Sequence, residues 1–346
     1  LRQAVDVCDT QRKPINSKER SARIAGKELN ELYPYYGATG QVGYIDGYIT
    51  DGEYVLLGED GAPFLNTFAK KAYIISGKAW VNNHAHIVKT NELADLNYIC
   101  YLLNHSDIAG YITGSAQPKL SQGNLNKIKI SLPALPLQRR IASILSAYDN
   151  LIEANSRRIK ILEQMAENLY KEWFAYKKIH NSAKQVKIKD IISITRGISY
   201  SSAEIDCEDG LDLINLKNIQ GFGGFRLDGT KKYNGKYKSS QIVKTGDLVM
   251  GVTDMTQDRR TVGHVALIPH TSNVSVISAD LIKLSSQIDS TYLYVMFRYG
   301  NVSRHISQFA NGSNVLHLRP QVVENVKILL PEQELIDKFV SIIKPI

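Results

Sequence analysis

The residues of this chain that could do chemistry are mainly basic and aromatic side chains. In the second half, four lysines alternate with two tyrosines, and two adjacent arginines follow. Lysine and arginine bind phosphate, and an arginine can also read guanine through two hydrogen bonds. We predict a polyanion-binding surface, with a solvated loop as the alternative for the lysines. The candidates are Lys231, Lys232, Lys236 and Lys238, interleaved with Tyr233 and Tyr237, and Arg259, Arg260, Ser313 and Arg319.

A second group of candidates lies in the first half of the chain. Tyrosines beside a glycine turn can lie against a sugar-phosphate backbone, and glutamine can pair with adenine. Packing in a core is an equal alternative for the two tyrosines. The candidates are the turn Tyr35, Tyr36, Gly37, Ala38, Thr39 and Gly40, and the segment with Ser115, Gln117 and Lys119.

Signatures of catalysis are missing from the sequence. It has no phosphate-binding loop of the G-x-x-x-x-G-K-[ST] type and no G-x-S-x-G nucleophile elbow. The eight histidines and three cysteines show no convincing metal-ligand spacing. His84 and His86 could form a metal pair, but we favour structural histidines beside Asn82 and Asn83. We therefore expect no catalytic, cofactor-binding or metal-binding residue.

The elements that must position these candidates occur twice. The chain reads G-S-A-Q-P-K-L from Gly114 and G-S-N-V-L-H-L from Gly312, which is 198 residues later, and the register holds to Pro133 and Pro331. Solenoid repeats are at most about 50 residues long, so a repeat of this length indicates a duplicated domain. A protein with two copies of one domain most simply performs one kind of task at two places.

Each copy is expected to be of mixed α/β type, in an α+β protein. In the first copy, we predict strands at 42–49, 54–57, 72–75 and 128–132 and helices at 95–104, 106–113 and 120–126. In the second copy, we predict strands at 186–193 and 241–252, a loop at 221–238 and a helix pair at 291–310. The predicted domains are 1–133, a spacer helix at 134–185, 186–331, and the start of a distal spacer helix at 332–346.

The spacer shows a coiled-coil pattern. Apolar residues recur at alternating spacings of four and three, which is a heptad seam of about five heptads. Neither proline nor glycine interrupts it, and 138–177 would span about 60 Å. A second seam begins with Ile336, Phe339, Val340 and Ile343. The first seam consists of Ile141, Leu145, Tyr148, Ile152, Asn155, Ile159, Leu162, Ala166, Leu169 and Trp173.

Composition agrees with a binding protein. The net charge is +8, which favours a polyanionic partner, and 43% of the residues are hydrophobic, as in globular proteins. No apolar run is long enough to span a membrane. The three isolated cysteines suit a reducing compartment, so we expect a cytoplasmic location.

These residues carry a resemblance to a known family. The runs 33–46 and 51–62, the segments 117–121 and 136–145, and the heptad helix from Asp149 to Phe174 resemble the specificity (S) subunit of type I restriction-modification enzymes. The resemblance covers essentially the whole chain. It implies a non-catalytic subunit in which each target-recognition domain reads one half of an asymmetric, interrupted DNA site.

The resemblance also implies partners. The central and distal helices would pair as an antiparallel coiled coil that sets the gap between the two DNA half-sites. Two methyltransferase (M) subunits, which bind S-adenosylmethionine, would dock on this chain, and ATP-driven restriction (R) subunits would join them. The cofactors S-adenosylmethionine, ATP and Mg²⁺ are thus expected on partner subunits and none on this chain.

The sequence departs from the family pattern at both ends. It begins without a methionine, and it stops within the expected distal helix. A homodimer through the 137–177 helix is the prediction if the distal helix is absent. Three alternatives stay open: a coiled-coil scaffold with two protein-binding domains, a specificity component of a related restriction or phage-defence system, and a nuclease or base-modifying enzyme. The enzyme would require an acidic Mg²⁺ cluster that the sequence does not show.

Overall fold

The computed structural model describes residues 1–60, 70–114, 118–176, 183–205, 208–271 and 273–345. The chain forms two compact units, Leu1–Ser156 and Arg157–Ile346. The division between them falls within the long helix Leu135–Tyr170 (α4). None of the helices in the described ranges combines the length and apolar character needed to cross a bilayer.

The first unit is built on a six-stranded sheet with the order β1-β6-β4-β5-β2-β3, in which β2 pairs with β5 in parallel and the other neighbours are antiparallel. The strands are Val5–Val7 (β1), Tyr33–Gly37 (β2), Gly40–Ile45 (β3), Thr50–Gly58 (β4), Ala72–Val81 (β5) and Ala85–Thr90 (β6). The helices are Ser17–Ile24 (α1), Leu96–His105 (α2) and Gln122–Leu125 (α3), with short 3-10 turns at Asp9–Gln11, Leu29–Glu31 and Ala109–Tyr111.

The core of this unit lies between α2 and the sheet. Helix α2 begins where the Asp95 carboxylate accepts a hydrogen bond from the Tyr98 backbone N–H at 2.9 Å, which satisfies one of the free donors of the first turn. Its buried residues Ile99 and Leu103 pack against Val55 and Leu57 of β4. Burying such side chains contributes roughly 1.5–3 kcal/mol each, so β4 is held firmly and its end is a rigid support.

The second unit contains two four-stranded sheets with the orders β10-β9-β15-β11 and β14-β12-β16-β8, and two-stranded pairs β13-β17 and β18-β7. The strands are Lys184–Lys187 (β7), Ile192–Arg196 (β8), Leu211–Ile214 (β9), Lys231–Tyr233 (β10), Ile242–Val243 (β11), Leu248–Gly251 (β12), Thr253–Asp254 (β13), Val265–Leu267 (β14), Ser275–Ile277 (β15), Leu281–Ser286 (β16), Leu316–His317 (β17) and Lys327–Leu330 (β18). The helices are Ser290–Tyr299 (α5), Val302–Ser307 (α6), Pro320–Asn325 (α7) and Gln333–Ile343 (α8), with 3-10 turns at Ile188–Asp190, Ser202–Glu204, Leu216–Asn218, Leu227–Gly229 and Ser239–Gln241.

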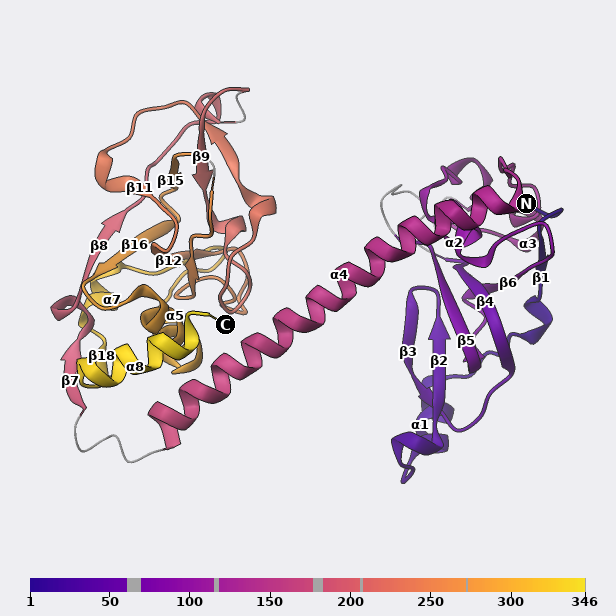
Figure 1. Cartoon of the computed structure of the whole chain (residues 1–346), viewed down its shortest axis with the longest axis horizontal. Coiled ribbons are helices and arrows are strands. Elements are labelled where there is room, and N and C mark those ends of the chain that lie inside the picture. Colours follow the sequence, from indigo (N-terminus) through magenta and orange to yellow (C-terminus); the bar gives the residue numbers. More distant parts are fainter. Residues whose placement is uncertain (61–69, 115–117, 177–182, 206–207, 272, 346) are drawn as a thin grey trace. The chain divides into compact units, whose positions relative to one another are not determined.

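The predicted long helix is confirmed. Helix α4 runs without a break over Leu135–Tyr170 and continues as a π-helix over Lys171–Tyr176 (Figure 1). In the middle of the heptad seam, Tyr148, Ile152 and Ile159 are 64%, 63% and 59% exposed. Asn155 is exposed as well, whereas both ends of the seam are at least half-buried. A partner for the middle of the seam is therefore not found among the described residues.

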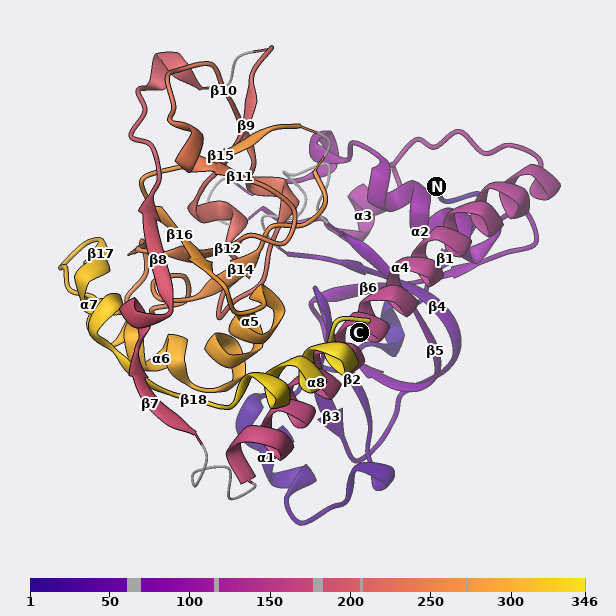
Figure 2. The same ribbon diagram turned by 60° about the vertical axis from the view of Figure 1, so that its left-hand side comes forward.

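The second predicted seam packs on the end of α4. In α8, Ile336, Phe339 and Ile343 are buried in the core of the second unit. The Phe339 ring lies 5.0 Å from that of Phe174 and 5.8 Å from that of Trp173. Both views show α8 beside the C-terminal end of α4 (Figures 1 and 2). These aromatic contacts close the base of the second unit.

Four element predictions require correction. The expected strand at 128–132 is absent, because Ile128 packs into the core without a neighbouring strand to pair with. The expected helix at 106–113 is only the 3-10 turn Ala109–Tyr111. The single strands predicted at 186–193 and 241–252 are each two strands. A capped 3-10 turn separates β7 from β8, and a turn with Gly246 at φ +85° separates β11 from β12.

The loop predicted at 221–238 also contains structure, since Lys231–Tyr233 forms β10. The remaining helix predictions agree well with the structure: α2, α3 and the pair α5 and α6 begin and end within three residues of the expected limits. Strands β1, β2 and β6 and helix α1 were not predicted. Their apolar runs are short and show little periodicity, so pairing within the sheet determines them.

Candidate functional site

The two units share one contact that follows the sequence repeat. In the first unit, Lys119 forms β-bridges with Thr113 and Asp60. In the second unit, His317, which stands 198 residues after Lys119, pairs with Asn311 and Thr253. We call the segments that contain Lys119 and His317 the returning segments. Each of them pairs with the second residue after the end of a central strand, β4 in the first unit and β12 in the second.

The next residue repeats the match. The Leu120 backbone N–H donates to the Glu59 carbonyl at 2.9 Å, and the Leu318 N–H donates to the Val252 carbonyl at 2.8 Å. Because backbone bonds of the same register occur at both places, the duplicated sequence builds a duplicated loop arrangement. We take these two loop pairs as the candidate functional sites.

In the first unit, three loops gather at the end of β4. The turn between β2 and β3 lies so close to Gly58 that a Cβ atom there would stand 2.7 Å from the Ala38 carbonyl oxygen. The Asn82 N–H, in the turn between β5 and β6, donates to the Tyr36 carbonyl at 3.1 Å. Only glycine fits at position 58, so the turn around Thr39 is held against the strand that carries Glu59 and Asp60.

The predicted residues of this unit differ in their surroundings. Tyr35 is buried with Ile45 and Trp80, and the Arg20 guanidinium lies 4.8 Å from its ring, so the ring serves core packing. Tyr36 is half-buried at 5.9 Å from the ring of Tyr73. Gly37 accepts a hydrogen bond from the Tyr73 hydroxyl, and Thr39 is exposed. Ser115 and Gln117 lie outside the described residues.

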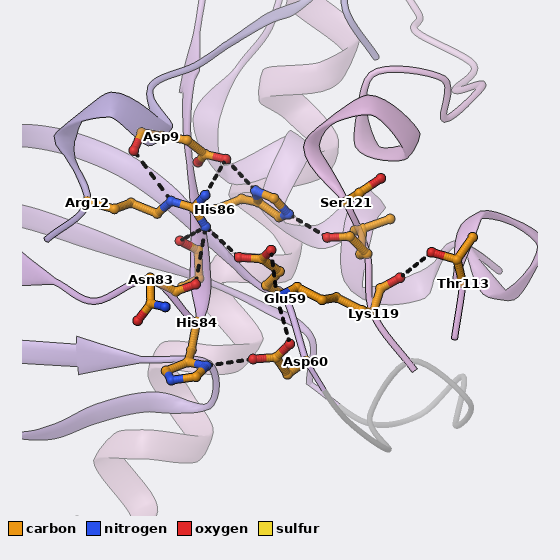
Figure 3. A network of polar contacts seen from close by, with 12 residues as sticks. Asp9, Arg12, Glu59, Asp60, Asn83, His84, His86, Thr113, Lys119 and Ser121 are labelled. Atoms are coloured by element: carbon orange, nitrogen blue, oxygen red, sulfur yellow. Dashed lines mark hydrogen bonds and ion pairs between the residues drawn. The ribbon is translucent and has the colours of Figure 1, made fainter. Parts of the chain in front are cut away.

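A network of charges surrounds Lys119 (Figure 3). Its Nζ lies 3.3 Å from Glu59 Oε1 and 3.6 Å from Asp60 Oδ1, and the hydrogen bond to Glu59 together with both negative charges raises the pKa of Lys119. Arg12 Nη1 lies 2.5 Å from Glu59 Oε2, and His84 Nδ1 lies 2.6 Å from Asp60. Lys119 therefore lies in the candidate site, where two carboxylates already balance its charge.

His86 belongs to the same network but is fully buried. Its Nδ1 lies 2.6 Å from Asp9 Oδ2 and its Nε2 lies 2.7 Å from the Leu120 carbonyl. Desolvation raises the pKa of Asp9. Hydrogen bonds from His86 and the Ile87 N–H, together with the charges of His86 and Arg12, lower the pKa by more than desolvation raises it, so the net shift is downward. The imidazole thus ties strand β6 to the returning segment.

The histidine pair at His84 and His86 is structural. The two side chains engage different carboxylates, Asp60 and Asp9, instead of facing one ligand. Within the described ranges, no cluster of histidine, cysteine, aspartate and glutamate has the arrangement of a metal site.

In the second unit, one buried carboxylate organises the corresponding loop. Asp254 accepts hydrogen bonds from the Thr256 N–H and hydroxyl at 2.8 Å each, from the Thr261 N–H at 2.6 Å and from the Val262 N–H at 3.3 Å. Desolvation raises its pKa, but these donors outweigh it, and the net shift is downward. The loop between Asp254 and Thr261 is thereby closed on itself.

This loop presents the predicted arginines. Arg260 is exposed, and Arg259 is half-buried with φ +52° and with its Nε buried without a hydrogen-bond partner among the described residues. Gln257 donates from Nε2 to the Ser313 carbonyl at 3.0 Å, which fastens the loop to the turn after Asn311. The structure therefore brings Arg259, Arg260 and Ser313 together.

A hollow of about 540 Å³ adjoins Arg260. Lys217 and Arg226 line it as well, and they were missed because each is an isolated basic residue within a loop-rich stretch. Asp228 forms a two-bond pair with Arg226, at 3.0 and 2.6 Å. Only folding reveals that these side chains share a surface with Arg260.

The predicted lysines lie elsewhere in the second unit. Lys231 and Lys232 are on β10, in the sheet β10-β9-β15-β11, whereas the loop with Arg259 and Arg260 follows β13, which pairs with β17. Lys232 forms an ion pair with Asp212 at 2.8 Å. Lys236 and Lys238 are exposed beyond β10. Arg319 is exposed at the start of α7.

Asp254→Asn is expected to destabilise the second unit by about 1.5–3 kcal/mol at neutral pH, because the amide would turn a donor toward backbone N–H groups. Since the pKa of Asp254 is lowered by folding, its contribution is complete above the unfolded value and is lost as the pH falls through the folded value. Denaturant unfolding at several pH values measures this, with the exposed Asp258→Asn in the same loop as control. Equal stability of the two variants would contradict the role of Asp254.

Comparisons with known proteins agree with this architecture. Residues 2–164 match the family described as type I restriction modification DNA specificity domain. A relative from Haemophilus influenzae that carries the name of a type I restriction enzyme specificity subunit is 32% identical over 147 residues, covering 42% of this chain and 36% of the relative. The match thus spans about a third of that relative's length.

Two further comparisons extend over most of the chain. A type I restriction enzyme specificity subunit of Methanocaldococcus jannaschii is 24% identical over 348 residues, covering 91% of this chain and 79% of the relative. The crystal structure of a type I restriction-modification S subunit from M. genitalium aligns with a TM-score of 0.69 at 12% identity, covering 99% of this chain and 87% of that one, and shows the same fold. The chain is thus similar to type I restriction-modification specificity subunits, over residues 2–164 in the family match and over 91% of its length in the Methanocaldococcus jannaschii relative.

Proposed function

We propose that this chain is the non-catalytic DNA-recognition subunit of a type I restriction-modification complex. Each unit reads one half of an asymmetric, bipartite DNA site. The observation that carries the proposal is the repeated loop arrangement, in which Lys119 and His317 occupy equivalent places beside Asp60 and Thr253. Two equivalent sites with different side chains suit two half-sites of different sequence.

The two loop pairs differ in a way that supports separate recognition. In the first unit, the ion pairs of Lys119 with Glu59 and Asp60 leave a balanced polar surface. In the second unit, Arg226 is paired with Asp228, which leaves Arg260 and Lys217 as the basic side chains at the hollow that can contact phosphates or guanine edges. The proposed DNA-contacting set is the candidate residues named from the sequence without Tyr35, whose ring packs in the core, and with Lys217 and Arg226 added.

The spacer and the partners complete the proposal. The domain limits are 1–133, 134–185, 186–331 and 332–346, with the α4 seam setting the distance between half-sites. The exposed middle of the seam, at Tyr148, Ile152 and Ile159, is available to a second helix, from the distal seam or from a second copy. Methyltransferase subunits dock on the chain, restriction subunits join them, and S-adenosylmethionine, ATP and Mg²⁺ bind to those partners.

A methylation map of DNA from cells that express the chain with its methyltransferase subunit tests this function. A single interrupted, asymmetric motif is expected. Arg260→Ala should relax one base position in one half-site, because a bidentate arginine–guanine pair discriminates by about 1–3 kcal/mol. Lys189→Ala, which removes an exposed basic residue of the same unit outside the proposed DNA-contacting set, is the matched control.

The outcomes separate the alternatives. Modification of the same motif by the partner alone would contradict the specificity role. An even loss across all sequences with Arg260→Ala would assign Arg260 to phosphate binding instead of base reading. A change in both half-sites would contradict independent recognition by the two units.

A further inference from the structure

One exposed aromatic residue of the second unit is held in a strained conformation. Phe222 has φ +67° and is 56% exposed. An exposed phenylalanine alone needs no explanation, but a bulky residue in the left-handed region is rare and costly. The two residues that follow, Gly223 and Gly224, also have positive φ, at +105° and +110°, but glycine adopts this region without the steric cost that Phe222 bears. Such strain persists where the surroundings enforce it, and it concentrates at functional sites.

The turn that carries Phe222 is fixed by backbone hydrogen bonds. The Phe222 N–H donates to the Arg260 carbonyl at 2.7 Å, the Gly223 N–H to the Gln220 carbonyl at 2.9 Å, and the Gly224 N–H to the Val265 carbonyl at 2.9 Å. Two of these bonds reach the arginine loop and the strand behind it. The ring is therefore presented by a preorganised backbone.

One cation and one buried imidazole lie beside the ring. The Arg260 guanidinium lies 5.8 Å from the ring centroid, and the buried His264 ring meets it edge-on at 5.6 Å. Gly221 adjoins the Arg260 side chain so closely that a Cβ atom would stand 3.2 Å from its Nε. Arg259 follows in the same loop, also at positive φ. Two strained residues, Phe222 and Arg259, thus flank Arg260.

We propose that Phe222 is a wedge that inserts against a base step of the half-site bound by the second unit and partly unstacks it. Apolar side chains flanked by arginine do this in DNA-binding proteins, and aromatic rings stack on any base. The inference rests on the proposed function and adds a residue to it. A rigid wedge makes recognition depend on how easily the step unstacks, which is a readout separate from base-edge hydrogen bonds.

The experiment uses the full chain co-expressed with its methyltransferase subunit and a duplex selected by this complex from a random-sequence pool. The fluorescent base 2-aminopurine is placed at successive positions of both half-sites. Methyltransferases flip their target base out of the duplex, so one rise in each half-site is expected from that step and should persist in every Phe222 variant. One further rise is expected at another position of one half-site, and only this rise is assigned to the wedge. Phe222→Ala should abolish the rise and weaken binding about 5- to 100-fold, as for loss of one stacked base. Phe222→Leu, which keeps an apolar wedge, should retain most of the rise.

Two further variants exclude a structural explanation. Phe222→Gly relieves the positive φ, so its thermal midpoint should equal or exceed that of the parent while the fluorescence rise is lost. Phe309→Ala removes a comparable exposed ring that meets His305 edge-on at 5.2 Å and should change neither readout. A lower midpoint with unchanged DNA binding in Phe222→Gly would overturn the wedge.

The experiment also distinguishes a failure of the wedge from a failure of the proposed function. If the complex selects a bipartite duplex but Phe222→Ala binds it with the parent's affinity and fluorescence, the wedge is wrong and the proposed function stands. If no duplex is selected by the complex, the proposed function fails, and the wedge fails with it.

Discussion

Phe339→Ala is expected to lower the free energy of unfolding of the second unit by about 3–5 kcal/mol. The ring is fully buried and lies against Tyr170, Trp173, Phe174 and Tyr292, so its removal loses transfer free energy and leaves a cavity that several rigid rings cannot fill. Because this cluster joins α8 to the end of α4, the loss should also loosen the helix end.

The chain carries its own probes for this prediction. It has two tryptophans, Trp80 in the first unit and Trp173 in the aromatic cluster. In a Trp80→Phe background, denaturant unfolding followed by fluorescence reports on the second unit alone. Ile342→Ala, on the exposed side of α8, is the control and should cost less than about 1 kcal/mol. A similar small loss for both variants would show that α8 is not part of this core.

His86→Leu should destabilise the first unit by about 1.5–3 kcal/mol at neutral pH, the loss expected for a hydrogen bond to a charged group. The substitution keeps an apolar volume but leaves the Asp9 carboxylate without its closest partner and the Leu120 carbonyl without a donor. Asp9 keeps the Ile87 N–H and Arg12 as partners, so its charge stays partly compensated. The returning segment would also lose its tie to β6, so Lys119 should become less ordered.

The pH dependence gives this prediction its sign. Folding lowers the pKa of Asp9, so its contribution is present above the unfolded value of about 3.9 and is lost as the pH falls through the folded value. The difference between parent and His86→Leu should therefore shrink in acid. Fluorescence of Trp80 in a Trp173→Phe background measures it, with the exposed His84→Leu as control. A difference that stays constant down to pH 3 would assign the loss to packing alone.

Several features follow from the sequence because they depend on local or periodic patterns. The heptad spacing from Ile141 to Trp173 predicts α4, since a helix of this length needs an uninterrupted apolar stripe. The repeat places Lys119 and His317 in equivalent bridges because equal register in a duplicated domain preserves strand pairing. Arg259 and Arg260 are adjacent in the sequence, so the backbone alone places both of them in the loop between Asp254 and Thr261.

Other features depend on contacts between residues that are distant in the sequence, and only the tertiary structure decided them. Asp9 and His86 are 77 residues apart and are joined by the pairing of a 3-10 turn with β6. The sequence left core packing and backbone contact as equal alternatives for Tyr35, and packing on Trp80 makes it a core residue. Lys217 and Arg226 line the same hollow as Arg260, although both are more than 30 residues before it in the sequence. The sequence thus determined the duplication and the helix, whereas packing decided which side chains meet, because burial and charge pairing are properties of the assembled core.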